Sequence, residues 1–261
     1  MKNLILLLLL IVSQYTVAAG SNFVYIEQIG TSSTNILTIE QVGSSNNIGG
    51  TNTTSTTIST SGPNIPGNIT TLVPESPSSS NYATINGNSN NITITQTGDN
   101  NSSQYNLKGS DNNYTNILTG DNNQTKLTLG DSNTNNLRNT ISELFTGNNN
   151  LSIQNLLGND INSNTTINGD YNQLTQLLHN NFGSSTNTIN GNFNVFFTEQ
   201  IDTGQHTLIS AVTGDYNSIT TQQQGSNDTT IDISITNGNN NTITVRSSSA
   251  SIVNPQSAIV R

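Results

Sequence analysis

The chain has 261 residues, of which 30% are hydrophobic and 8% are charged, with no cysteine, no tryptophan and a formal net charge of −9. Six Lys and Arg residues in an acidic chain argue against a nucleic-acid partner, because binding to the phosphate backbone depends on positive charge. Without cysteine, no disulfide can hold the fold together.

Residues 1–19 have the parts of a secretory signal peptide. Lys2 precedes an unbroken apolar run from Leu4 to Val12, which is too short to cross a bilayer, and Val17-Ala18-Ala19 suits cleavage after Ala19. The pattern predicts a secreted protein, extracellular or at the cell surface, without a membrane span after cleavage. An N-terminal membrane anchor is the alternative.

Residues 20–47 contain two strand-length units, Asn22–Gly30 and Asn35–Gly43, each closed by a glycine. From 48–80 the sequence changes to Gly, Ser, Thr and Pro, and four of the five prolines lie there. Because proline cannot donate to a strand ladder, this segment is predicted to be an excursion loop or a linker.

Residues 81–245 form the main repeat array. From Asn90 to Gly130 the same short unit occurs three times without a break and then once more, one residue shorter, and glycine recurs every 11 residues. Two units together give a period of mostly 22 to 24 residues with two strands and two turns. A fixed period of this kind predicts an all-β fold, a β-solenoid of stacked two-strand rungs with an amyloid-like arrangement.

Most closing glycines are followed three residues later by asparagine. The step from Gly169 to Gly191 is twice 11 residues, so we predict Asn180 as an additional closing position with positive φ, which asparagine tolerates. The longer step from Gly130 to Gly147 predicts a bulge near 133–138. The motif is lost in residues 246–261, which are predicted to form a tail or cap.

In alternate units from Gly120 to Gly214, an apolar residue stands two places before the closing glycine, whereas Gln96 occupies that place before Gly98. Stacking of the rungs would bring these residues into one core column, while alternation along each strand turns their neighbours outward. The column consists of Leu118, Phe145, Ile167, Ile189 and Val212.

The best-preserved units are Asn35-x5-Gln41-x-Gly43-x-x-Asn46, Asn90-x5-Gln96-x-Gly98-x-x-Asn101 and Asn217-x5-Gln223-x-Gly225. This pattern resembles the curlin repeat of curli fibre subunits. The resemblance implies an extracellular functional amyloid that serves adhesion and biofilm matrix, with the chain itself as partner in a homopolymer, a related curli-type subunit as a further partner, and no cofactor. Leu107, Leu118 and Leu156 depart from the repeat, which has glutamine there.

On this pattern and its spacing, a set of amides and glycines is predicted to form inward ladders and turns. These are Gln28, Gly30, Asn35, Gln41, Gly43, Asn46, Asn90, Gln96, Gly98, Asn101, Gly109, Asn112, Gly120, Asn123, Asn150, Gly158, Gly169, Asn172, Gly191, Asn194, Gln200, Gly214, Asn217, Gln223 and Gly225. Identical amides about 4.7 Å apart can donate to and accept from the rungs above and below.

Aspartate follows the glycine at Asp99, Asp121, Asp170 and Asp215. Stacked carboxylates suit Ca²⁺, but Gly-Asp is also favourable turn chemistry, and the nonapeptide calcium repeat is absent. We therefore expect no metal site, with these four as the candidates if one exists.

Three other classes of function stay open. Threonine before the glycine at positions 97, 119, 146 and 213 allows an ice-binding solenoid. Such a surface requires a second column, and two places earlier Ile117, Leu144 and Ala211 interrupt the one formed by Thr95, Thr166 and Thr188. A monomeric secreted adhesin is the other non-enzymatic alternative. His179 and His206 occupy no recognisable nucleophile or metal spacing, so we expect no catalytic residues and no enzymatic activity.

Overall fold

A computed structural model describes residues 22–29, 35–49, 56–58, 69–71, 83–130, 136–236, 242–248 and 256–260. The predicted signal peptide and Gly30 lie outside these ranges. None of the described residues is helical, and none forms a segment that could span a membrane as a helix.

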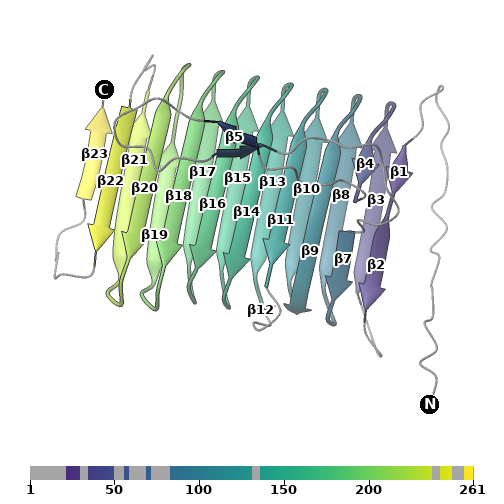
Figure 1. Cartoon of the computed structure of the whole chain (residues 1–261), viewed down its shortest axis with the longest axis horizontal. Coiled ribbons are helices and arrows are strands. Elements are labelled where there is room, and N and C mark those ends of the chain that lie inside the picture. The colour runs from purple at the N-terminus through teal and green to yellow at the C-terminus, as the bar shows by residue number, and fades with distance from the viewer. Residues whose placement is uncertain are drawn as a thin grey trace.

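The described chain is a β-solenoid, as the repeat period predicted. Successive long strands alternate between two sheets whose neighbouring strands are all parallel, so one turn of the chain adds one strand to each sheet. We call this pair of strands a rung. In Figure 1 the strands follow one another along the long axis, from the purple β1–β3 at one end to the yellow β22 and β23 at the other.

The first sheet contains β1 (Phe23–Val24), β2 (Ile26–Ile29), β4 (Asn47–Ile48), β7 (Ala83–Asn86), β9 (Ser102–Ser110), β11 (Gln124–Leu129), β12 (Asn136–Leu137), β14 (Leu151–Leu157), β16 (Gln173–His179), β18 (Val195–Ile201), β20 (Ser218–Gln224) and β22 (Thr242–Ser248). The second sheet contains β3 (Ile36–Val42), β8 (Asn91–Thr97), β10 (Asn113–Thr119), β13 (Thr140–Thr146), β15 (Asn162–Asn168), β17 (Ser184–Asn190), β19 (His206–Ala211), β21 (Thr229–Ile235) and β23 (Gln256–Val260). A separate antiparallel pair joins β5 (Thr56–Ile58) and β6 (Ile69–Thr71).

The strand register places like residues on like. Leu118 pairs with Gln96 on one side and with Phe145 on the other, and Phe145 pairs with Ile167. Ile167 pairs in turn with Ile189, and all of these apolar residues, together with Val212, belong to one buried cluster. The five residues of the predicted core column therefore lie one above another between the two sheets.

The predicted loop interrupts a strand of the first sheet. β4 and β7, which flank it, both pair with β9, through Ile48–Ser103 and Ile85–Leu107. The described residues between 22 and 47 consequently belong to the same stack as the array that follows. At the other end, β23 pairs in parallel with β21, so strand pairing continues beyond residue 245.

Three details of the register differ from the sequence-based expectation. Gly130 follows Leu129, which pairs with Leu107, so Gly130 occupies the place of Lys108, and Asn136 pairs with Gly109. The extra residues of this rung therefore lie before Asn136. The closing position after β18 belongs to Asp202, with φ of 86°, and Gly204 lies two residues beyond it.

Asn180 is the third difference. Its carbonyl lies directly against Gly158, so it belongs to the predicted column of closing residues. It is, however, not among the residues with positive φ, so the conformational reason for predicting it was wrong.

Candidate functional site: side-chain ladders along the stack

An asparagine column follows the edge where the chain passes from the second sheet to the first. Each asparagine binds the rung that follows: the Asn101 Oδ1 accepts the backbone N–H of Asn123 at 3.0 Å, and its Nδ2 donates to the Gly120 carbonyl at 2.7 Å. The same two bonds repeat along the edge. The column comprises Asn22, Asn46, Asn101, Asn123, Asn150, Asn172, Asn194 and Asn217.

Asparagine suits this position because one short side chain carries both an acceptor and a donor. Aspartate would lose the bond to the glycine carbonyl. Most of these side chains are buried, and a buried backbone group left without a partner costs about 1–3 kcal/mol. The column therefore joins each rung to its neighbour with bonds that exist only within a stack.

Glycine is required at the turn because adjacent rungs approach closely there. Gly169 has φ of 116°, and a Cβ added to it would overlap the carbonyl oxygen of Gly191 in the next rung. Two residues after Gly169, Tyr171 adopts the left-handed conformation with φ of 58°. The repeat Gly-x-x-Asn is thus a turn with two positive φ values that ends in the ladder residue.

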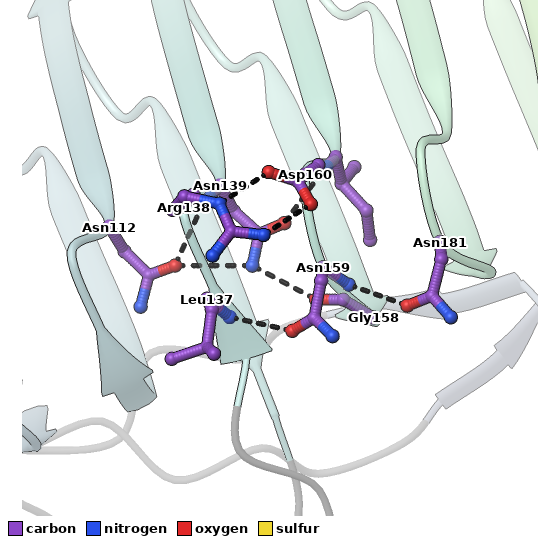
Figure 2. Close-up of polar contacts among 9 residues, drawn as sticks. Asn112, Leu137, Arg138, Asn139, Gly158, Asn159, Asp160 and Asn181 are labelled. Carbon is purple, nitrogen blue, oxygen red and sulfur yellow. Dashed lines mark hydrogen bonds and ion pairs between the residues drawn. The ribbon is translucent and has the colours of Figure 1, made fainter.

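The opposite edge carries a second asparagine column, made of Asn35, Asn90, Asn112 and Asn139. Figure 2 shows its last member, where the Asn139 Nδ2 donates to the Asn112 Oδ1 at 3.1 Å and to the Gly158 carbonyl at 3.0 Å. Sequence analysis missed Asn139 because the extra residues separate it from Gly130. Only the strand register, which places Asn139 next to Asn112, identifies it as a ladder residue.

Next to Asn139 lies an ion pair between consecutive rungs. Arg138 Nε and Nη2 each donate to one carboxylate oxygen of Asp160 at 2.8 Å (Figure 2). These hydrogen bonds lower the pKa of Asp160. Because Arg138 is 60% exposed, water screens the pair, and we expect it to contribute little to stability.

The second asparagine column ends at Asn139. Its Oδ1 accepts the backbone N–H of Ile161 at 2.7 Å, but Ile161 has no side-chain amide that could bond the next rung. Gly183, His206 and Thr229 follow it in register. His206 is buried and bonds the Thr229 hydroxyl through Nδ1 at 2.7 Å. The two edges therefore differ: one column persists along the stack, whereas the other is replaced halfway.

The four candidate aspartates do stack in one column outside the first asparagine column. Their Oδ1 atoms accept backbone N–H groups of the preceding rung, as between Asp121 and Asp99 at 2.7 Å. Asn148 and Asn192 alternate with Asp170 and Asp215 in the same role. The carboxylates thus act as turn acceptors, and the described residues contain no group of three His, Cys, Asp or Glu side chains suited to a metal.

Glutamine stacks only in part of the interior. The Gln41 Nε2 donates to the Gln96 Oε1 at 2.8 Å, and the Gln200 Nε2 donates to the Gln223 Oε1 at 2.6 Å. The first pair lies in the second sheet, where Leu118 follows Gln96 in register. The second pair lies in the first sheet, where Leu107, Leu129 and Leu156 precede it in one column, all buried. Gln28 pairs in register with Ile85 in that same column.

A buried carboxyl group lies in the middle of the core. Glu143 receives hydrogen bonds from Ser152 and Gln154 on Oε1, both at 2.9 Å, and from Asn116 and Tyr114 on Oε2 at 2.9 and 3.1 Å. Its burial raises its pKa, and the four donors oppose that effect without cancelling it. No described residue pairs it with a cation.

An exposed aromatic column, which sequence analysis also missed, follows the first edge. Tyr171, Phe193 and Tyr216 stack with ring centroids 5.0 Å apart and planes within 3°. They are 53%, 44% and 55% exposed and all have positive φ, which bulky side chains rarely adopt. Their common place two residues after a glycine was the signal that could have revealed them.

No protein family, curated protein or solved structure matches this chain. The fold and its ladders define the chain as a β-solenoid with repeated Gly-x-x-Asn turns.

Proposed function

We propose that the chain is a structural subunit of an extracellular, curli-like functional amyloid fibre that serves adhesion and biofilm matrix. The supporting observation is the directional ladder. Each asparagine side chain bonds the backbone of the rung that follows it, so a further rung from another copy could make the same bonds. In this proposal the partners are further copies of the chain and a related curli-type subunit, and no residue is catalytic.

The end strands favour such addition. Among the described strands, β3 pairs only with β8, and β22 pairs only with β20. An open strand edge presents unpaired N–H and C=O groups that a strand of another chain can satisfy. End-to-end stacking would continue the parallel register from one copy into the next.

Fibre formation by the mature chain, residues 20–261, tests this proposal. We expect thioflavin-T-positive fibres whose diffraction shows a meridional spacing of about 4.7 Å. A chain that stays monomeric at high concentration would contradict the proposal and would favour the monomeric adhesin.

A proline variant makes the test specific to the end strand. The Ile36 amide donates to the carbonyl of Asn90, which directly precedes β8, so alternation along β3 turns the amide of Ile39 toward the open edge. Proline is tolerated where the N–H faces away from the sheet, so Ile39→Pro should fold but add no further copy at that end. Ile39 packs against the core, so Ile39→Ala, which shortens the same side chain but keeps the backbone donor, is the matched control and should elongate like the parent.

A further inference from the structure

The outward face of the second sheet carries three parallel columns of small hydroxyl, amide and methyl groups across β8, β10, β13, β15 and β17. The register fixes these columns, because the strands pair residue by residue in steps without a slip. We call the fifteen positions the threonine face. They are Thr93, Thr115, Ser142, Asn164 and Thr186; Thr95, Ile117, Leu144, Thr166 and Thr188; and Thr97, Thr119, Thr146, Asn168 and Asn190.

From this array we infer that the threonine face binds ice. The groups repeat in two directions, about 4.8 Å from strand to strand and about 7 Å between alternate residues of a strand. None of the fifteen side chains is buried. The face is therefore a two-dimensional array in which thirteen of the fifteen positions carry a hydroxyl or an amide, interrupted in the middle column by Ile117 and Leu144, and such a repeat in two directions resembles the order of a crystalline surface.

The hydroxyl groups of the face are available to water. Within the described part of the chain, the threonine hydroxyls of the face have no hydrogen-bond partner, and the bond between Asn168 and Asn190 at 3.0 Å is the one bond between side chains of the array. By contrast, the inward Thr125 and Thr165 accept bonds from Asn116 and Gln154. The outward hydroxyls are thus free to hold ordered water, which hydrogen-bonds nearly as well as a direct partner.

The face offers no charged side chain to an ionic ligand. None of the fifteen residues is charged or aromatic, although the chain as a whole carries a net charge of −9. Interleaved threonine methyl groups, with Ile117 and Leu144, add apolar contact between the hydroxyls. A neutral, periodic array with mixed hydroxyl and methyl groups fits a lattice of water molecules better than an ionic polymer or a soluble sugar.

The inference is independent of the proposed fibre, because the threonine face lies on the side of the stack and leaves both ends open. A monomer and a fibre would each present it. Measurements on ice therefore separate it from fibre formation, which is followed by thioflavin-T in the same preparations.

Thermal hysteresis and inhibition of ice recrystallisation by the mature chain test the inference. We expect both activities in the parent, and loss of most of the hysteresis in Thr166→Tyr, whose bulky ring would stand at the centre of the array. Tyrosine is a good strand residue, so the thermal unfolding midpoint should stay unchanged. Thr128→Tyr, on the outward side of β11 in the other sheet, is the matched control and should retain the activity.

Absence of hysteresis and of adsorption to growing ice in the folded parent would overturn the inference. Equal loss in Thr166→Tyr and Thr128→Tyr would also overturn it, since the effect would then not belong to this face. So would binding of the parent to a crystalline polysaccharide that Thr166→Tyr abolishes, with no binding to ice.

Discussion

A single asparagine of the first column joins three successive rungs. The Asn150 Nδ2 donates to Gly169 at 2.7 Å and to the Asn123 Oδ1 at 3.0 Å, and its Oδ1 accepts the amide of Asn172 at 2.9 Å. Replacement by alanine leaves a buried N–H and a carbonyl without partners. We expect Asn150→Ala to lower the free energy of unfolding by about 2–5 kcal/mol.

Denaturant unfolding of Asn150→Ala measures this loss. The control is Asn162→Ala, which removes an exposed amide from the outward side of β15 and should change the free energy of unfolding by less than about 0.5 kcal/mol. Equal effects of the two substitutions would show that the inward ladder does not stabilise the stack more than surface amides do.

Glu143 makes stability depend on pH through its burial. Because its pKa is raised in the folded state, its contribution to stability is present below the ordinary glutamate pKa of about 4.3 and is lost as the pH rises through the folded-state value. Glu143→Gln removes this titration. We therefore expect the parent to lose stability relative to the variant as the pH rises above about 4.3.

Unfolding midpoints measured from acid to neutral pH check the prediction for Glu143. The carboxylates Asp99 and Asp160, whose pKa values are lowered by hydrogen bonds from Ser44 and Arg138, act in the opposite direction in both proteins. Only the difference between parent and variant reports on Glu143. A constant difference across the pH range would show that the buried carboxyl does not titrate in this window.

At the scale of one turn, two aromatic residues of similar strain differ in their partners. Phe182 is 56% exposed with φ of 58°, whereas Phe193 has φ of 57° and stacks between Tyr171 and Tyr216. Asparagine adopts this conformation readily, and the strain in other residues is about 1–2 kcal/mol. We expect Phe182→Asn to stabilise the protein by about 1 kcal/mol.

The same change at Phe193 loses two stacking contacts, each worth about 0.5–1.5 kcal/mol, so Phe193→Asn should be neutral or destabilising. Thermal unfolding of the two variants decides between these effects. If both substitutions stabilise equally, the aromatic column contributes nothing to the fold.

A strand or turn can be predicted from the sequence when the residues that determine it lie close together in the chain. The core column from Leu118 to Val212 followed from period and alternation, because these reflect the geometry of strands and turns. The ladder role of Asn139 and the closing role of Asp202 could not be predicted in this way. An insertion before Asn139 and a longer turn after β18 shift the register, and only the pairing with neighbouring rungs shows it. The network around Glu143 joins both sheets, and no spacing within one strand encodes it.

In the whole molecule, the stability of each rung depends on its contacts with the neighbouring rungs, so the rungs of the interior and those at the ends must differ in stability. The long strands β10, β11 and β13 to β18 have a neighbour on each side, whereas the end strands β1, β2, β3, β22 and β23 have one among the described strands. In a monomer, amide hydrogen exchange should therefore be slowest in the middle and faster at both ends, because end rungs open locally.

Fibre formation by end-to-end stacking would change only those ends. We expect the amides of β3, such as Ile39, to become as protected in the fibre as those of β10, while protection in β10 to β18 stays nearly constant. Exchange measured on monomer and fibre of the same preparation, with Ile39→Pro as the variant that cannot pair, gives this comparison. Addition at the ends must complete the ladders of the end strands first. An equal gain of protection in every strand would therefore point to a rearranged core in the fibre. A gain of protection confined to the aromatic column near Phe193 would point to lateral association.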